Sequence, residues 1–353
     1  MLATLAISAT GGFLFSLAGV PAAWIAGGML AVAATTLAGF DSDMPTPLRD
    51  LVFLVLGVIA GTGVNPATIH QMVSWPISFV ILVVTVFLVA LSGYVFFSRF
   101  CGWDRNSALF ASLPGALSFV LAAAEMTNAD MRRVAVAQSL RLIVLLEALP
   151  AAAWISGIHP SGMPSRTDAP VIPLELLLLY ALGAVGGLIL NRLRIPGGIM
   201  LGGLTVAAVL YVSGAVTTAV PTWILVPALI GLGAVAGCRL RPEDRHLLKS
   251  TLASASGAFV VAVVISAAGA GLVTWLLGVP IEQTFMAFAP GALEALTILA
   301  FTLHIDPAYV AAHHVVRFMV LAFSVPLIAR WLMRLDASDA ARAEAQAAGS
   351  GKG

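Results

Sequence analysis

Two arginines and two Pro-Gly pairs are the residues of this sequence whose types and spacing could do chemistry. Arg141 follows the Pro114-Gly115 pair by 27 residues, and Arg317 follows the Pro290-Gly291 pair by the same 27. All of them lie in apolar runs, where an arginine near the bilayer centre costs at least about 2.5 kcal/mol even on the most lenient insertion scale. Each guanidinium therefore needs a protein partner, a polar cavity or an anion.

The Pro-Gly pairs interrupt helices in places where lipid offers the backbone no hydrogen-bond partner. Helix ends freed in this way carry partial charges, so their N-termini favour anions and their carbonyls favour cations. Interrupted helices at corresponding places of two halves are the sequence feature that best indicates a transporter's binding site. The alternative is that each pair only kinks a packing helix, since Pro and Gly are both commoner in membrane helices than in soluble ones.

The two arginines approach the middle of the membrane from opposite sides in this interpretation. Arg141 lies eight residues beyond Arg133 and Arg317 ten residues beyond Pro307, which is about 12 and about 15 Å along a helix. Three roles stay open for them. They could bind an anion directly, they could form an internal ion pair or clamp the carbonyls exposed at the Pro-Gly breaks, or they could gate a pathway.

Polar residues precede each arginine by one helical turn. Gln138 lies three residues before Arg141, and His313 and His314 lie four and three residues before Arg317. That spacing predicts one shared helix face, with the side chains pointing at the same place. The histidines could move protons near neutral pH, or each could satisfy a buried carbonyl.

A carboxylate distinguishes the second Pro-Gly segment from the first. Glu294 follows Pro-Gly-Ala-Leu in the second copy, where the first copy has Ser118. Glu294 could pair with an embedded arginine or could couple the movement of H⁺ or Na⁺. The predicted solute-binding residues are Pro114, Gly115, Ser118, Gln138, Arg141, Pro290, Gly291, Glu294, His314 and Arg317, and the predicted ion-coupling residues are Glu294, His313 and His314.

The composition requires lipid as the solvent. The 353 residues are 60% hydrophobic and only 10% charged, against about 25% charged in average soluble domains. Runs such as Trp75–Phe97 and Ser254–Leu277 reach the roughly 20 apolar residues that cross a bilayer. The sequence predicts an all-α polytopic membrane protein in a bacterial inner membrane.

The same composition excludes several other classes of function. The net charge is +1, so no basic face indicates nucleic-acid binding. We expect no cofactor, no metal site and no enzymatic activity, and we expect Cys101 and Cys238 to be packing residues. The expected partners are a small-molecule solute, H⁺ or Na⁺, the lipid bilayer and a second copy of the chain in a homodimer.

The chain also repeats itself at an offset of 175 or 176 residues. Proline, glycine, aspartate and arginine positions all match in one register, which compositional bias does not produce. The matched pairs include Pro21 and Pro196, Pro114-Gly115 and Pro290-Gly291, Asp130 and Asp306, Arg141 and Arg317, and Pro150 and Pro326. We predict a first membrane repeat over 1–154, a connector over 155–172, a second repeat over 173–334 and a polar tail over 335–353.

The distribution of basic residues predicts the topology. Lys and Arg accumulate in cytoplasmic loops. If each Pro-Gly segment is a re-entrant hairpin, each repeat has five transmembrane helices, the halves are inverted and both termini are cytoplasmic. All of the 18 basic residues except Arg141, Arg166 and Arg317 then lie inside. Six crossings per repeat would instead place Arg330 and Arg334 on the side opposite Arg239–Lys249.

The paired blocks "LPGAL…AAAEM…NADMRRVAVAQSLRL" and "APGALEALTILAFTLHIDPAYVAAHHVVRF" resemble the AbrB family of bacterial integral membrane proteins. That family has a duplicated membrane domain with a Pro-Gly block, an acidic residue and then a Gln/His-x-x-Arg helix. Its members carry the labels "ammonia monooxygenase" and "transcriptional regulator", and it is unrelated to the small soluble DNA-binding regulator of the same name. The resemblance implies kinship with inverted-repeat cation:proton antiporters and anion transporters, and it leaves the solute open.

The leading hypothesis is a secondary transporter of a small, anionic organic solute, coupled to H⁺ or Na⁺, with its site between the two Pro-Gly hairpins. The alternative is a membrane sensor that alters gene expression through a partner. A membrane oxygenase is disfavoured, because the sequence lacks a copper or iron ligand cluster.

Overall fold

A computed structural model shows an all-α protein. It describes residues 1–64, 75–114, 117–155, 170–195 and 197–350. Five of its helices are long and apolar enough to cross a membrane: Trp75–Phe100, Met131–Ala152, Pro173–Arg192, Pro242–Leu277 and Pro307–Arg334. The prediction of an all-α polytopic membrane protein is therefore confirmed.

The helices recur along the chain in the same order in both halves. In the first half they are α1 (Leu2–Leu17), α2 (Ala23–Leu37), α3 (Thr46–Thr62), α5 (Trp75–Val95) with the π-helical turn η2 (Phe96–Phe100), α6 (Arg105–Ser112), α7 (Leu117–Ala124) and α8 (Met131–Ile155). In the second half they are α9 (Pro173–Arg192), α10 (Gly198–Val212), α11 (Thr222–Gly237), the 3-10 turn η3 (Pro242–Asp244) with α12 (Arg245–Leu277), α13 (Ile281–Phe288), α14 (Leu293–Thr302) and α15 (Pro307–Ser350).

Several bounds repeat at the offset found in the sequence. Adding 175 to the bounds of α2 gives 198–212, the bounds of α10, and adding 176 to those of α6 gives 281–288, the bounds of α13. The capping residues repeat as well. The Asp130 carboxylate accepts a hydrogen bond from the Arg133 amide (3.0 Å), and the Asp306 carboxylate accepts one from the Ala308 amide (2.8 Å). The prediction that Asp306 caps the helix beginning at Pro307 is confirmed.

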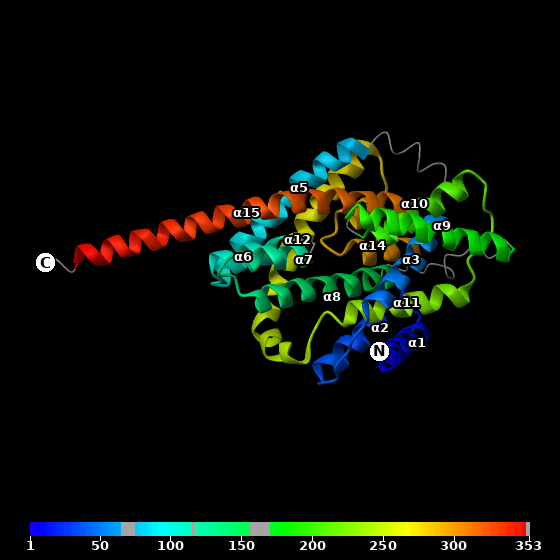
Figure 1. The fold of residues 1–353 in the computed structure, drawn as a ribbon, viewed down its shortest axis with the longest axis horizontal. Helices are drawn as coiled ribbons and strands as arrows, with labels where there is room; N and C mark the ends of the chain where they lie inside the picture. The colour runs from blue at the N-terminus through cyan, green and yellow to red at the C-terminus, as the bar shows by residue number, and fades with distance from the viewer. Residues whose placement is uncertain (65–74, 115–116, 156–169, 196, 351–353) are drawn as a thin grey trace.

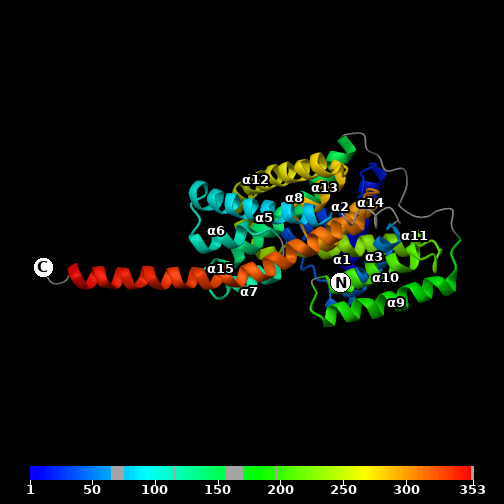
Figure 2. The same cartoon turned by 90° about the horizontal axis from the view of Figure 1, so that it is seen from above.

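The helices assemble into two bundles, and each bundle takes helices from both halves (Figures 1 and 2). We call α1–α3 with α9–α11 the glycine bundle, and α5–α8 with α12–α15 the broken-helix bundle. Each has its own core of buried apolar side chains, one around Leu56 and Met200 and the other around Leu82 and Leu145. Helix α14 lies at the boundary, because Leu293, Ile298 and Phe301 pack into the core of the glycine bundle.

Glycines bring the backbones of the glycine bundle into contact. A Cβ atom added at Gly57 of α3 would lie 2.1 Å from the Met200 carbonyl oxygen of α10, and one at Gly202 of α10 would lie 2.3 Å from the Gly186 carbonyl of α9. Only residues without a side chain allow this approach. The prediction that these glycines let helices pack closely is confirmed.

The C-terminal segment continues the last helix. Helix α15 runs from Pro307 to Ser350, so the polar tail from Asp336 to Ser350 is helical and projects away from both bundles (Figures 1 and 2). Most of the connector over 155–172, and His70 in the first half, lie outside the described residues.

Candidate functional site

Both Pro-Gly segments break a helix in two. Helix α6 ends at Ser112 and α7 begins at Leu117, and likewise α13 ends at Phe288 and α14 begins at Leu293. These helices have 8 to 10 residues, hence lengths of about 12 to 15 Å. None of the four could cross the roughly 30 Å hydrocarbon core alone. Pro114 is buried, and Gly115 lies outside the described residues.

The first break is held by two side chains of α8. The Arg141 guanidinium donates from Nη2 to the Leu113 carbonyl oxygen (3.1 Å), and the Gln138 amide donates from Nε2 to the Phe110 carbonyl oxygen (2.8 Å). The last carbonyls of a helix have no partner within it. Arg141 and Gln138 supply the missing donors at the end of α6.

The second break is held in the same way by α15. Arg317 donates from Nη1 to the Ala289 carbonyl oxygen and from Nη2 to that of Gly291, each at 2.5 Å. The His314 ring donates from Nε2 to the Met286 carbonyl oxygen (3.2 Å) and accepts a hydrogen bond from Arg317 Nη2 at Nδ1. This pattern fits the neutral ring with its proton on Nε2.

The contacts at the two breaks correspond residue by residue. Four hydrogen bonds, two at each break, join residues that are 28 positions apart. Adding 176 to Gln138, Phe110, Arg141 and Leu113 gives His314, Met286, Arg317 and Ala289. Among the described residues, no acidic oxygen lies within 4 Å of either guanidinium. Of the roles left open for the arginines, the carbonyl clamp is the one for which the structure shows contacts.

The two breaks also meet each other. A Cβ atom added at Gly291 would lie 2.7 Å from Leu145, one turn beyond Arg141 on α8. Arg141 and Arg317 are close enough to repel each other electrostatically, and Arg317 is only 4% exposed. The structure therefore brings Pro290, Gly291, His314 and Arg317 into one region with Gln138 and Arg141.

His313 does not share the site of His314, contrary to the expectation from the sequence. Its Nδ1 donates to the Tyr309 carbonyl oxygen (2.8 Å), and its Nε2 accepts from the Ser78 hydroxyl of α5 (2.6 Å). The ring is fully buried and packs on Phe79 and Tyr309, with ring centroids 4.7 and 4.0 Å away. Consecutive residues of a helix point about 100° apart, so the two histidines face different neighbours.

Glu294 faces the glycine bundle instead of an embedded arginine. It lies in the first turn of α14 and is half-buried. Its Oε1 atom is 3.4 Å from the position of a Cβ added at Gly197, the N-cap residue of α10. It also interacts with Arg239, whose pKa is lowered by burial, an effect that Glu294 opposes and Arg49 reinforces. A carboxylate at a helix N-terminus is favourably placed, and this one joins the two bundles.

Sequence reasoning missed part of this arrangement. Arg239 was assigned to a cytoplasmic loop, and nothing marked Gly197 as a neighbour of Glu294. The clamped carbonyls of Phe110, Leu113 and Met286 also had no signal of their own, because a backbone acceptor has no residue type. The side chain of Ser118 lies outside the described residues.

The fold and these breaks define an all-α membrane protein with two broken helices, each clamped by an arginine. A *Bacillus subtilis* (strain 168) protein named "Uncharacterized protein YhjN" is 26% identical over 365 residues, covering 94% of this chain and 92% of the relative. An *Escherichia coli* (strain K12) protein named "Putative regulator AbrB" is 26% identical over 319 residues, covering 89% and 90%. Residues 24–333 match the family described as "Transition state regulatory protein AbrB", and the chain belongs to this family.

Proposed function

We propose that this protein is a secondary transporter of a small, anionic organic solute, driven by H⁺ or Na⁺ in the bacterial inner membrane. The observation that carries the proposal is the pair of broken helices, each clamped by a buried arginine and meeting within one bundle. Discontinuous helices at corresponding places in two halves form the solute sites of many secondary transporters.

The arrangement of the bundles supports alternating access. Each bundle draws helices from both halves (Figure 1), as inverted repeats of five transmembrane helices would arrange them. The glycine bundle is packed backbone to backbone and would serve as the scaffold. The broken-helix bundle carries the arginines and would move against it, with both termini in the cytoplasm.

Glu294 is the group best placed to couple this movement to an ion. It is carried by the broken-helix bundle but lies against α10 and near Arg239 of the glycine bundle. Binding H⁺ or Na⁺ at this carboxylate would weaken its attraction to Arg239 and to the α10 N-terminus. The neutral ring of His314, held between Arg317 and Met286, is the second candidate.

Counterflow in liposomes tests the proposed function. The purified chain should exchange an organic anion identified by a thermal-shift screen, and Arg141→Ala or Arg317→Ala should abolish the exchange. Arg330→Ala, at an exposed position further along α15, is the matched control and should keep it. Wild-type exchange in both clamp variants would show that the site assignment is wrong.

A membrane sensor that alters gene expression through a partner is the second candidate, because the *E. coli* relative is named a putative regulator. A sensor would change expression of a target gene without moving solute. In a deletion strain, a transport-inactive Arg141→Ala variant that restores wild-type expression would favour the sensor, and one that fails to restore it would favour transport as the primary activity.

A further inference from the structure

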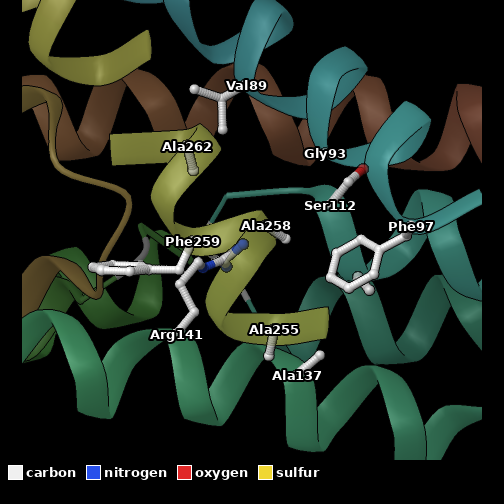
Figure 3. Close-up of a pocket in the computed structure, with 11 residues that line it drawn as sticks. Val89, Gly93, Phe97, Ser112, Ala137, Arg141, Ala255, Ala258, Phe259 and Ala262 are labelled. Carbon is white, nitrogen blue, oxygen red and sulfur yellow. The ribbon is translucent and has the colours of Figure 1, made fainter. Parts of the chain in front are cut away.

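The surroundings of Arg141 include a small cavity that the repeat-related region around Arg317 does not keep. The cavity lies between α5, α6, α8 and α12, and its volume is about 20 Å³, which accommodates about one water-sized group. Figure 3 shows the Arg141 guanidinium reaching from α8 to Ala258 and Phe259 of α12. The lining residues are Val89, Gly93, Phe97, Ala111, Ser112, Ala137, Arg141, Ala255, Ala258, Phe259 and Ala262.

The walls of this cavity are small and carry one charge. Of the lining residues only Arg141 and Phe259 are not fully buried. No acidic side chain lines the cavity, and Arg141 is its only cationic member. An isolated cation with apolar walls attracts an anion strongly, since the low local dielectric strengthens the charge–charge interaction.

Larger side chains occupy the corresponding positions in the other half. At the offset of 176 residues, Ser112 corresponds to Phe288, Ala137 to His313, Ala255 to Phe79 and Ala258 to Leu82. Phe288, His313 and Leu82 are at most 2% exposed, and the His313 ring lies 4.7 Å from the Phe79 ring and 6.1 Å from the Phe288 ring, centroid to centroid. Aromatic side chains therefore occupy the positions whose counterparts are small around Arg141.

The hydrogen bonds of the two arginines differ in the same direction. A guanidinium has five N–H donors. Arg317 directs its two Nη groups at two carbonyls and at the His314 ring. Arg141 has Gln138 in place of that histidine, and the Gln138 amide bonds the Phe110 carbonyl instead. Within the described part of the chain, Arg141 bonds one carbonyl, that of Leu113; Gly115, the counterpart of Gly291, lies outside it.

We infer that Arg141 binds the anionic group of the solute in this cavity, and that Arg317 serves to hold the second break. A single guanidinium and space for one water-sized group fit a monoanion, such as one carboxylate of the solute or a free ion like formate, nitrate or chloride. The inference rests on the proposed function in taking the solute to be an anion, but the binding itself requires no transport.

Anion binding to the purified full-length chain in detergent tests this inference. At constant ionic strength, formate, nitrate or chloride should raise the unfolding temperature saturably, because a ligand that binds only the folded state stabilises it. Arg141→Gln should abolish the rise. Ala258→Leu, which introduces the residue found at position 82, should weaken binding at least tenfold while it keeps the guanidinium.

Val260→Leu is the matched control for Ala258→Leu, since Val260 is 58% exposed on the same helix, and it should bind as the wild type does. A wild-type chain that no monoanion stabilises, or an Ala258→Leu chain that binds at wild-type strength, would overturn the inference. Binding that Arg141→Gln removes while counterflow of the solute persists would support the anion site and contradict the proposed role of Arg141 in transport.

Discussion

Arg141 donates a hydrogen bond to the carbonyl oxygen of Leu113, 3.1 Å away and 28 positions earlier in the chain. The same relationship joins Arg317 to Ala289 in the other half. Each arginine thereby supplies a donor to a helix end inside the protein, where water cannot. The positive charge needed for an anion site and the donors needed to stabilise a broken helix come from the same side chains.

Removing the second clamp should destabilise the fold. Arg317→Ala leaves the Ala289 and Gly291 carbonyls without their donor, and each buried unsatisfied group costs about 1–3 kcal/mol. We expect a clear fall in the unfolding temperature in detergent, with Arg317→Lys recovering part of it because an ammonium donates without the fork geometry. Arg330→Ala on the same helix should change little. Equal stability of Arg317→Ala and Arg330→Ala would contradict the clamp.

Neutralising Glu294 should uncouple transport from its driving ion. Glu294→Gln keeps the shape of the side chain and its contact with α10 but cannot bind a proton or carry a charge. We expect solute counterflow to continue in liposomes, while accumulation driven by a pH or Na⁺ gradient is lost. Glu282→Gln, at an exposed position in α13, should accumulate solute normally. Gradient-driven accumulation in Glu294→Gln would exclude this carboxylate as the coupling group.

Close backbone contact in the glycine bundle should make Gly57 intolerant of a side chain. A Cβ atom at this position would lie 2.1 Å from the Met200 carbonyl oxygen, so Gly57→Ala must push α3 and α10 apart. Gly271 of α12 has nothing within 4 Å of an added Cβ, and alanine is the better helix former by about 1 kcal/mol. Thermal unfolding should show Gly57→Ala destabilised and Gly271→Ala unchanged or stabilised. The opposite order would refute the packing.

Cys238 should react slowly with thiol reagents at neutral pH. Burial raises the pKa of its thiol to about 11, with a smaller contribution from Asp43. The thiolate is the reactive form, so a raised pKa leaves the group protonated and inert at pH 7. In a Cys101→Ser background, labelling by iodoacetamide should rise about tenfold per pH unit up to about pH 10. A rate that does not change with pH would mean that the thiol is not held protonated by its surroundings.

The sequence was sufficient for the features that depend on composition and on local patterns. Apolar runs of sufficient length indicated membrane helices, and the Pro-Gly pairs located the interruptions that the structure shows at 113–116 and 289–292. Asp306 was identified as a helix cap, and the glycine motifs were identified as contact points. All of these follow from the solvent that a segment requires and from the conformations that its own residues allow.

Other features required knowledge of which helix faces which. The sequence placed His313 and His314 at one site, whereas packing directs His313 to Ser78 and His314 to Arg317. Glu294 was considered a partner for an embedded arginine, but α14 lies at the boundary and turns it to Gly197. These outcomes depend on the orientation of each helix about its own axis, which neighbouring helices determine.

The sequence by itself determined that the chain is helical, that lipid is its solvent and where its helices break. Only the tertiary structure decided that each bundle combines both halves, that arginines close the broken helix ends and that one arginine keeps a cavity. Those features join residues from 28 to more than 150 positions apart, such as Arg141 with Leu113 and with Ala258. Local sequence cannot specify such contacts, because they form only when complementary helix surfaces pack together.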